Sequence, residues 1–573
     1  MEIDTQTFIR NLDSKLKIFD KAGATALCQE LIVFLFASSE VFPLNDARKI
    51  LQLLRRKRMF ALMSKVADAC INTGRTSYAI RKLYSQSLID TGHLVAAKAV
   101  LHELISDTEQ VRLNDKDALV ENIEAKGLLG RVYKQLYVTV GNSNNTHSIK
   151  SIKDAITCYL DVYTSDNTHL WHGINAVALI NRAKIDGVDV SGYPDHHSLA
   201  EAILLVIEEK RLEQQAFYWD FATASEACIA LNRPGDALEW LSGYARMPEC
   251  DAFELGSTLR QFEEIWQLGM NKEIGNLLLP ILRAELLQKE GGAVIIDGEA
   301  LMQQKKNESS ATEGYKKLIK DTSIPDENGK RLEKVFGDDS FKTYKWYMKG
   351  ADRCAAVARI GIDSAKGFGT GFLMRGRGLC DALGEELILV TNAHVISGDP
   401  QEKAIHPNEA LIIFEALDRD AEFRLSEIIW SSSSSDLDAA ICRFSKEDQA
   451  KLEKLTEEKK VKLFPAFEHL PIVDEPPSQR IYLIGHPNGG TLQLSFQDNV
   501  LLDIEIPFIH YRTPTEGGSS GSPVFNQQWD LIGLHHAGDE KMPRLNGKQG
   551  LYEANEGIWI QSVRQKMCQQ ITI

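Results

Sequence analysis

The apolar residues of this chain follow two different periods, and the change between them constrains the fold more than any other feature. Up to about residue 290, apolar side chains recur at spacings of three and four, as in residues 47–71 and 77–105. That spacing is typical of amphipathic helices. From about residue 355 the period becomes two, and glycines and prolines separate short apolar runs, which is typical of strands. We therefore expect an all-α half followed by an all-β half.

The segment between the two halves differs from both. Residues 288–345 are polar and charged, and they carry glycines and serines, which favours a linker. A short helical pattern over 340–360 could brace the two halves. A chain of 573 residues has room for two to four domains. We predict a helical domain over 1–287, a linker with a short helical brace over 288–345, and a β domain over 346–573.

The helical half shows signs of repeated helix pairs. Residues 217–247 read as a helix, a turn marked by Asn232, Pro234 and Gly235, and a second helix. Small residues lie where paired helices must approach each other closely, as at Ala222. Repeated pairs of this kind indicate tetratricopeptide-like stacking with a period near ~34 residues.

The second half contains many short strand-like runs, which predict an all-β barrel or sandwich. These runs are residues 355–362, 369–374, 385–391, 410–416, 480–485, 530–536 and 557–563.

Charge and cysteine content exclude several classes of function. The formal net charge is −15, so the broad positive field that attracts nucleic acid or anionic membrane is missing. The N-terminus lacks the layout of a signal peptide, and the apolar run 31–37 is far shorter than the ~20 residues of a membrane span. We expect a cytoplasmic protein that binds neither nucleic acid nor membrane. Nine cysteines without a CxxC pair argue against a disulfide framework and a structural zinc site, and no cofactor is expected.

Three strings in the β half carry the residue types that acyl transfer needs. LVTNAHVI (389–396) presents His394 after a strand, and SSDLDAAICRF (434–444) places Asp438 at the start of a buried run. TEGGSSGSPVF (515–525) holds Ser520 in a glycine-rich turn. The order His, Asp, Ser is that of chymotrypsin, and the separations allow one barrel to supply the first two residues and the next barrel the third.

Each of these residues has a chemical role to fill. A serine hydroxyl is a poor nucleophile until an imidazole takes its proton, and a buried carboxylate holds that imidazole in one tautomer. Backbone N–H groups in a tight turn can stabilise the oxyanion, and here we expect Gly518 and Ser520 to donate them. We predict a catalytic triad of His394, Asp438 and Ser520, with no metal.

Asp436 is the rival carboxylate. If Asp436 were the partner of the histidine, Asp438 would point into the core without a partner, which costs several kcal/mol. We therefore favour Asp438 over Asp436.

The β half resembles the trypsin-like serine peptidases, and within them the glutamyl endopeptidase branch. The matching strings are TNAHV, DLDAAICRF, IGHPNGG, GGSSGSPVFN and LIGLHHAG, within about 355–570. The resemblance implies a double β-barrel with the active site between the barrels. It also implies that Thr515 and His535 line a pocket for an acidic side chain. Glu516 departs from the pattern, because an acid at the pocket would repel an acidic substrate, so basic and small apolar side chains stay open as alternatives.

The helical half resembles the TRAF-binding, tetratricopeptide-like domain of mitogen-activated protein kinase kinase kinases and its bacterial relatives. The strings ENIEAKGLLGRVYKQLY (121–137), LWHGINAVALI (170–180) and FYWDFATASEACIAL (217–231) carry the likeness, which covers roughly 40–285. It implies a scaffold for protein contacts rather than catalysis. We expect Trp171, Asn175 and Arg131 to lock helix pairs together, with direct partner binding as the alternative.

The two resemblances together predict a serine endopeptidase that cleaves a protein substrate and is gated by a helical domain that binds a regulatory protein. Fusions of this kind are similar to bacterial defence or signalling proteases. Ser519 stands where many secreted relatives have the aspartate that pairs with a newly cut N-terminus, so we expect control by the helical half instead of by trimming. The alternatives are a catalytically idle barrel in a scaffold protein, and an esterase that uses the same triad.

Overall fold

In the computed structural model the chain forms two compact units, Met1–Leu268 and Gly269–Ile573. The described residues are 4–17, 21–38, 42–140, 145–269, 272–289, 294–295, 312–313, 332–364, 367–400, 402–474, 479–495, 500–512 and 518–571.

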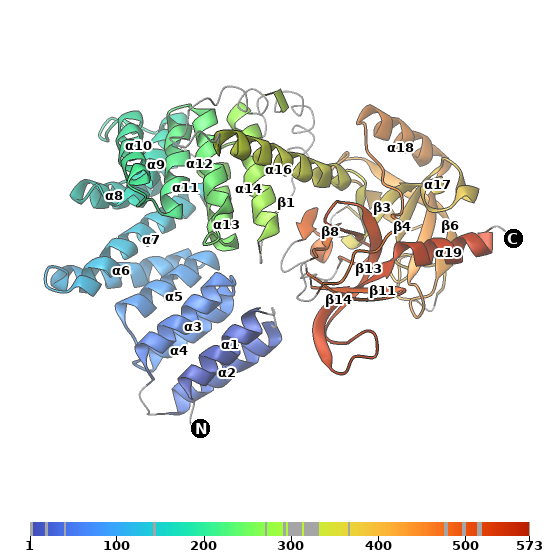
Figure 1. The fold of residues 1–573 in the computed structure, drawn as a ribbon, viewed down its shortest axis with the longest axis horizontal. Coiled ribbons are helices and arrows are strands. Elements are labelled where there is room, and N and C mark those ends of the chain that lie inside the picture. Colours follow the sequence, from blue (N-terminus) through green and yellow to red (C-terminus); the bar gives the residue numbers. More distant parts are fainter. Residues whose placement is uncertain are drawn as a thin grey trace. The chain divides into compact units, whose positions relative to one another are not determined.

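The first unit is built from helices that follow one another as packed neighbours (Figure 1). They are α1 (Thr5–Lys17), α2 (Lys21–Ala37), α3 (Leu44–Arg56), α4 (Phe60–Asn72), α5 (Tyr78–Asp90), α6 (Leu94–Val111), α7 (Lys116–Val140), α8 (Thr146–Ser165), α9 (Leu170–Ile185), α10 (His196–Leu212), α11 (Tyr218–Ala230), α12 (Pro234–Arg246), α13 (Ala252–Arg260) and the short π-helix η1 (Gln261–Ile265). The predicted helical-repeat half is confirmed.

The turn predicted within 217–247 joins α11 to α12. Asn232 has a φ of 54°, a left-handed conformation that asparagine tolerates better than most residues. Pro234 is the first residue of α12, where its missing N–H has no helical partner to lose. Ala222 is buried, so the small side chain lies where α11 packs on its neighbours.

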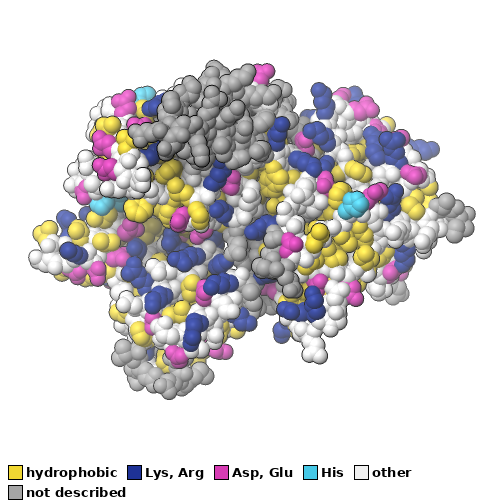
Figure 2. Space-filling view, in the orientation of Figure 1, with side chains coloured by type: hydrophobic (Ala, Val, Ile, Leu, Met, Phe, Trp, Pro, Cys, Tyr) yellow, Lys and Arg dark blue, Asp and Glu magenta, His cyan; other side chains and the backbone are white. Residues whose placement is uncertain are grey.

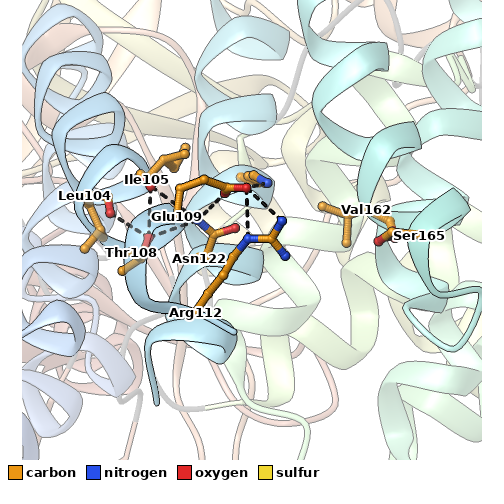
Figure 3. Close-up of polar contacts among 9 residues, drawn as sticks. Leu104, Ile105, Thr108, Glu109, Arg112, Asn122, Val162 and Ser165 are labelled. Carbon is orange, nitrogen blue, oxygen red and sulfur yellow. Dashed lines mark hydrogen bonds and ion pairs between the residues drawn. The ribbon is translucent and has the colours of Figure 1, made fainter. Parts of the chain in front are cut away.

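A polar cluster joins α6 to α7 (Figure 3). The Asn122 side chain donates to Thr108 Oγ1 at 2.9 Å and to Glu109 Oε2 at 3.1 Å. Arg112 Nε donates to the same glutamate at 2.8 Å, and Thr108 Oγ1 donates to the Leu104 carbonyl at 2.7 Å. Because Asn122 and Thr108 are buried, these bonds fix how the two helices face each other.

The residues expected to lock helix pairs do make contacts between helices. Arg131 on α7 lies 2.5 Å from the buried carboxylate of Asp90 on α5. On α9, the side chain of Asn175 donates to the Trp171 carbonyl at 2.9 Å and accepts from Lys134 Nζ at 3.1 Å. Direct partner binding by these residues stays untested.

The second unit begins before the predicted domain boundary. Its first helix, α14 (Glu273–Gln288), packs against α16 (Leu332–Cys354), so the compact unit starts at Gly269 and not at residue 346. The helical pattern expected over 340–360 belongs to α16, which starts earlier and ends at Cys354. The β1 strand (Val294–Ile295), inside the segment expected to be a linker, pairs with β9.

Six strands close into a barrel in the order β2-β3-β4-β7-β6-β5 (Figure 1). They are β2 (Val357–Gly361), β3 (Gly367–Arg375), β4 (Leu387–Thr391), β5 (Leu411–Ile413), β6 (Glu422–Ser432) and β7 (Ala439–Phe444). The buried rings of Phe414, Phe423 and Phe444 pack together in the interior, as a small barrel requires. The predicted β-barrel is confirmed.

The other strands form an eight-stranded sheet in the order β1-β9-β8-β12-β13-β14-β11-β10, so the second half of the expected double barrel is a sheet with two ends. They are β8 (Tyr482–Gly485), β9 (Gln493–Ser495), β10 (Leu501–Glu505), β11 (Phe508–Tyr511), β12 (Pro523–Phe525), β13 (Leu531–Pro543) and β14 (Leu551–Trp559). The unit also contains α17 (Gly376–Leu379), η2 (Asp381–Leu383), α18 (Lys446–Glu458), η3 (Pro487–Gly489) and α19 (Ile560–Ile571).

Two expectations for this unit need correction. The run 557–563 is only half strand, because β14 ends at Trp559 and α19 follows at once. We expected no disulfide framework, yet Cys380 and Cys568 form a disulfide that ties α19 to the segment after α17. The two cysteines are 188 residues apart, so their spacing in the sequence gave no sign of the pairing. Within the described part of the chain, no helix has the length and apolar content to cross a bilayer.

Candidate active site

A short turn after β4 presents His394 to the carboxylate of Asp438. The backbone N–H of His394 donates to Asp438 Oδ1 at 3.0 Å, and its ring Nδ1 lies 2.5 Å from Oδ2. The side-chain amide of Asn392 donates to the Asp438 carbonyl at 2.7 Å. Asp438 is fully buried, whereas the His394 side chain is 35% exposed. The carboxylate therefore fixes the ring at two points and leaves its other edge accessible.

Asp438 reaches this position through an unusual backbone conformation. Its φ is 41°, and its N–H donates to the Ser433 carbonyl at 3.0 Å just before β7 starts. A left-handed conformation costs free energy at most non-glycine residues, and aspartate is one of the residues that tolerate it best. Asp436, the rival, is 44% exposed and pairs with Ser432 and Lys566. The structure thus brings Asp438, and not Asp436, to His394.

A second histidine contacts the same carboxylate, and the sequence reasoning missed its role. His536 on β13 places Nδ1 2.7 Å from Asp438 Oδ2, the oxygen that His394 also contacts. His536 lies at a register shift of β13, between His535, which pairs with Gly557, and Ala537, which pairs with Glu556. The HH doublet was a usable signal, but the partner of His536 lies 98 residues away in the sequence.

The local charges shift the pKa values of this group in opposite directions. Burial raises the pKa of Asp438, but hydrogen bonds from His394 and His536 outweigh burial, so its pKa lies below the ordinary value. Burial lowers the pKa of His536, yet its hydrogen bond to Asp438 and the nearby charge of Glu556 bring the pKa above the ordinary value. The ionised carboxylate and a protonated His536 therefore stabilise each other.

The contacts of His536 continue through the sheet. Its Nε2 lies 3.6 Å from Glu556 Oε1 on β14, and Glu556 Oε2 lies 2.8 Å from His510 Nε2 on β11. The other ring nitrogen of His510 lies 2.8 Å from the Tyr552 hydroxyl. Asp438 therefore stands at one end of a row of polar side chains that crosses three neighbouring strands.

The turn that carries Ser520 is fixed by glycines and by β3. Gly518 and Gly521 have φ values of 90° and 85°, which side chains with a Cβ rarely adopt. A Cβ at Gly521 would clash with the carbonyl oxygen of Thr370. The Thr370 N–H donates to the Ser520 carbonyl at 2.9 Å, and its hydroxyl donates to the Gly518 carbonyl at 2.9 Å.

Two routes link this turn to the His394–Asp438 pair. On one side, Thr391, the last residue of β4 before the His394 turn, donates to the Thr370 carbonyl at 2.7 Å. On the other side, the Gly521 N–H donates to the His535 carbonyl at 3.0 Å, directly before His536. The three predicted triad residues therefore sit on connected elements. Among the described residues, the structure records no hydrogen bond between Ser520 and His394.

The IGHPNGG string supports the same turn. A Cβ at Gly518 would clash with the carbonyl oxygen of His486, so the turn 486–489 packs directly against the glycine expected to help hold the oxyanion. His486 is fully buried, and its N–H donates to Thr370 Oγ1 at 3.0 Å. Burial lowers the pKa of His486 to about 4, so its ring is a neutral structural element.

Of the three residues expected to select the substrate, only His535 is among the described residues. Thr515 and Glu516 lie outside the described residues. His535 is 3% exposed, and its Nδ1 lies 2.8 Å from the Tyr511 hydroxyl. Burial, with smaller contributions from the charges of His536 and His394, lowers the pKa of His535 to about 3, so this imidazole is neutral.

His394, Asp438 and His536 could also hold a metal ion, since their ligand atoms lie within 4.8 Å of one another. Two His and one carboxylate form a common ligand set for zinc. In this structure the same atoms are engaged in the hydrogen bonds between the imidazoles and the carboxylate.

Comparisons with known families agree with this division of the chain. Residues 369–534 match the model of the trypsin-like peptidase domain, and residues 47–180 match the model named Tetratricopeptide Repeats-Sensor. Neither match singles out the glutamyl endopeptidase branch or the TRAF-binding domain, which stay predictions.

Individual relatives are distant. An uncharacterized protein of Sinorhizobium fredii, y4fB, is 25% identical over 233 residues, which are 38% of this chain and 33% of that protein. The chain thus matches about a third of that relative's length. Among solved structures, the inactive form of the M. tuberculosis protease Rv3671c shares 16% identity, with 39% of this chain and 93% of that chain covered and a TM-score of 0.25. The serine protease domain of the Sesbania mosaic virus polyprotein shares 18% identity, with 37% and 91% covered and a TM-score of 0.24.

The closed barrel and the family match over 369–534 place a trypsin-like peptidase domain in the C-terminal region, after a TPR-like helical domain in the N-terminal region.

Proposed function

We propose that the C-terminal region is a serine endopeptidase that hydrolyses peptide bonds of a protein substrate. The observation that carries this proposal is the buried Asp438 carboxylate, which holds both the backbone and the ring of His394. That arrangement orients an imidazole as a general base, and the Ser520 turn lies on elements joined to it.

The chemistry follows from these positions. His394 Nε2 takes the proton of Ser520 Oγ as that oxygen attacks the substrate carbonyl. The N–H groups of Gly518 and Ser520 stabilise the oxyanion, and Asp438 stabilises the imidazolium. The leaving amine then takes the proton from His394, and an acyl group stays on Ser520. A water molecule then attacks the acyl group while His394 takes its proton, and the carboxylic acid product leaves as the proton returns to Ser520 Oγ.

For specificity we propose an acidic side chain before the scissile bond. When the Tyr511 hydroxyl donates to Nδ1 of neutral His535, the ring hydrogen lies on Nε2, which can donate to a carboxylate without a full counter-charge. Glu516 would oppose an acidic substrate. Basic and small apolar preferences are the alternative outcomes of the cleavage test below.

We also propose that the helical domain gates the peptidase and binds a regulatory protein, in the manner of defence or signalling proteases. The support is the presence of two separate compact units in one chain and the match of the first to a family named as a sensor. The proposal assigns control to that domain because Ser519, and not an aspartate, precedes Ser520.

A second candidate is a catalytically idle barrel in a scaffold protein, which the missing hydrogen bond between Ser520 and His394 among the described residues would favour. Cleavage-site profiling with a peptide library separates the two candidates. The full-length protein should cut the library, and the Ser520→Ala variant should not. Absence of cleavage by the wild-type protein, with and without proteins from its native cell, would support the scaffold.

A further inference from the structure

The helical unit contains a cavity of about 600 Å³ that the proposed peptidase chemistry does not use. Its lining comes from α3, α5, α7, α8, α9, α11, α13 and η1 and from the segment before α9, and every lining residue lies within Met1–Leu268. That volume falls in the range of ~300–1,000 Å³ typical of small-molecule sites. The cavity is therefore large enough for a ligand and belongs to a single compact unit.

One wall of the cavity carries two arginines that form no ion pair with a described residue, although the charge of Arg55 acts on Glu254. Arg48 and Arg55 lie seven residues apart on α3, on the same helix face, and both line the cavity. Arg48 is exposed and makes no ion pair with any described residue. The Nε of Arg55 is buried without a hydrogen-bond partner, and its guanidinium stacks over Phe253 at 4.7 Å. Figure 2 shows Lys and Arg side chains gathered on the face of this unit.

The other walls add three cations, Arg131, Lys134 and Arg260, which lie among the carboxylates of Asp90, Glu226 and Glu264. Arg131 lies 2.5 Å and Arg260 3.7 Å from the carboxylate of Asp90, and the charge of Glu264 also acts on both arginines. Lys134 Nζ donates to the neutral side chains of Asn175 and Gln261, at 3.1 and 2.8 Å. Burial and the charges of Arg131 and Arg260 lower the pKa of Lys134 to about 8, although the charges of Glu226 and Glu264 act in the opposite direction. An anion in the cavity would relieve this repulsion.

Four acidic residues also line the cavity. The charge of Asp220, Glu226 and Glu264 is reduced or already engaged, whereas Glu124 is exposed and makes no ion pair with a described residue. Glu226 accepts hydrogen bonds from Trp266 and Gln261, and burial raises its pKa. Burial likewise raises the pKa of Glu264. Asp220 pairs with Lys210 at 2.5 Å. Six Lys or Arg side chains line the cavity against these four acidic ones, so the net charge of the lining is positive.

Aromatic side chains provide a surface for a flat group. Trp171 and Trp219 both line the cavity. The Trp171 ring meets Tyr159 and His172 edge to face, with centroids 5.6 and 4.8 Å away, and the side chain is partly exposed. Indole rings stack well on planar bases, and Arg side chains bind phosphate oxygens.

We propose that this cavity binds a small ligand that combines phosphate groups with a planar ring, the chemical class of nucleotides. Arginines on α3 and the Arg131–Lys134–Arg260 group hold the phosphates, and a tryptophan supports the ring. This inference concerns the helical unit alone and does not depend on the proposed peptidase activity.

Isothermal titration calorimetry on the full-length Ser520→Ala chain tests the proposal. The probes are ATP and NAD for the whole ligand class, tripolyphosphate for phosphates without a ring, and tetraglutamate for an acidic peptide. The test variant is Arg48→Ala with Arg55→Ala. The matched control is Arg56→Ala, an exposed arginine of the same helix that does not line the cavity. Arg48→Ala alone, at an exposed position, keeps the test valid if the double variant does not fold.

We expect at least one nucleotide to bind with a Kd below about 1 mM and more tightly than tripolyphosphate. The double variant should weaken that binding at least tenfold, Arg48→Ala alone at least threefold, and Arg56→Ala should leave it unchanged. The proposal is overturned if neither nucleotide binds, if the α3 variants bind as the wild type does, or if tetraglutamate binds as tightly as the nucleotides. In the last case the occupant is an acidic peptide.

Discussion

Nδ1 of His536 lies 2.7 Å from Oδ2 of Asp438, the same oxygen that Nδ1 of His394 contacts. The carboxylate thus serves two imidazoles at once. A hydrogen bond from a donor keeps a buried carboxylate ionised and oriented. Here His536 supplies such a bond to Asp438 through Nδ1, and its Nε2 lies 3.6 Å from Glu556.

The first prediction concerns His536 as a positioning residue. His536→Gln should lower kcat about tenfold with little change in KM, because loss of the charge-assisted bond loosens Asp438 and, through it, His394. Steady-state kinetics on a cleaved peptide checks this. The matched control is His469→Gln, an exposed histidine of the same unit, which should not change kcat. An unchanged kcat in His536→Gln would show that the bond has no role in catalysis.

The pH dependence of stability gives a second prediction. The pKa of His536 is higher in the folded chain than in the unfolded chain, so its charge stabilises the fold below about pH 6.5 and that contribution is lost as pH rises through the folded pKa. Asp438, Glu556 and His394 are the titratable groups that face it. Urea unfolding of wild type and His536→Gln should give a stability difference that is larger near pH 6 than near pH 9. A difference that grows towards alkaline pH has the wrong sign for this account.

The third prediction separates the two neighbouring carboxylates. Asp438→Asn should reduce kcat by about ten-thousand-fold, because an amide does not hold His394 in the required tautomer or stabilise its charged form. Asp436→Asn is the matched control; it removes only a partly exposed contact with Ser432 and Lys566 and should keep nearly full activity. Equal losses in the two variants would mean that the assignment of Asp438 is wrong.

The fourth prediction concerns the backbone of the Ser520 turn. Gly521→Ala should destabilise the fold by about 3 kcal/mol or more, because a Cβ there meets the Thr370 carbonyl and the φ of 85° is strained for alanine. Gly547→Ala has a similar φ of 64° but open space around it, so it should cost only about 1 kcal/mol. Thermal or urea unfolding measures both. Similar losses would indicate that packing against β3 does not hold the turn.

Much of the architecture could be predicted from local pattern alone. The helix pairs follow from apolar spacing, and the turn at Asn232 and Pro234 was marked by its residues. The pairing of His394 with Asp438 could be predicted as well, because the alternative left a buried carboxylate without a partner.

What could not be predicted depends on contacts between distant segments. The Asp438–His536 contact and the Cys380–Cys568 bond join residues 98 and 188 positions apart. Neither has a local signature, because a histidine doublet on a strand and scattered cysteines fit many folds. The inclusion of α14 in the second unit likewise depends on packing against α16, and a helical period says nothing about which neighbour a helix chooses.

The most direct test of the account is active-site labelling of the full-length protein with a fluorophosphonate, followed by mass spectrometry of the labelled peptide. Ser519→Ala and Ser522→Ala serve as controls within the same turn. We predict that the label is found on Ser520, is lost in Ser520→Ala and His394→Ala, and is kept in the two controls. Labelling of another residue, or labelling that survives Ser520→Ala, would contradict the proposed acylating centre.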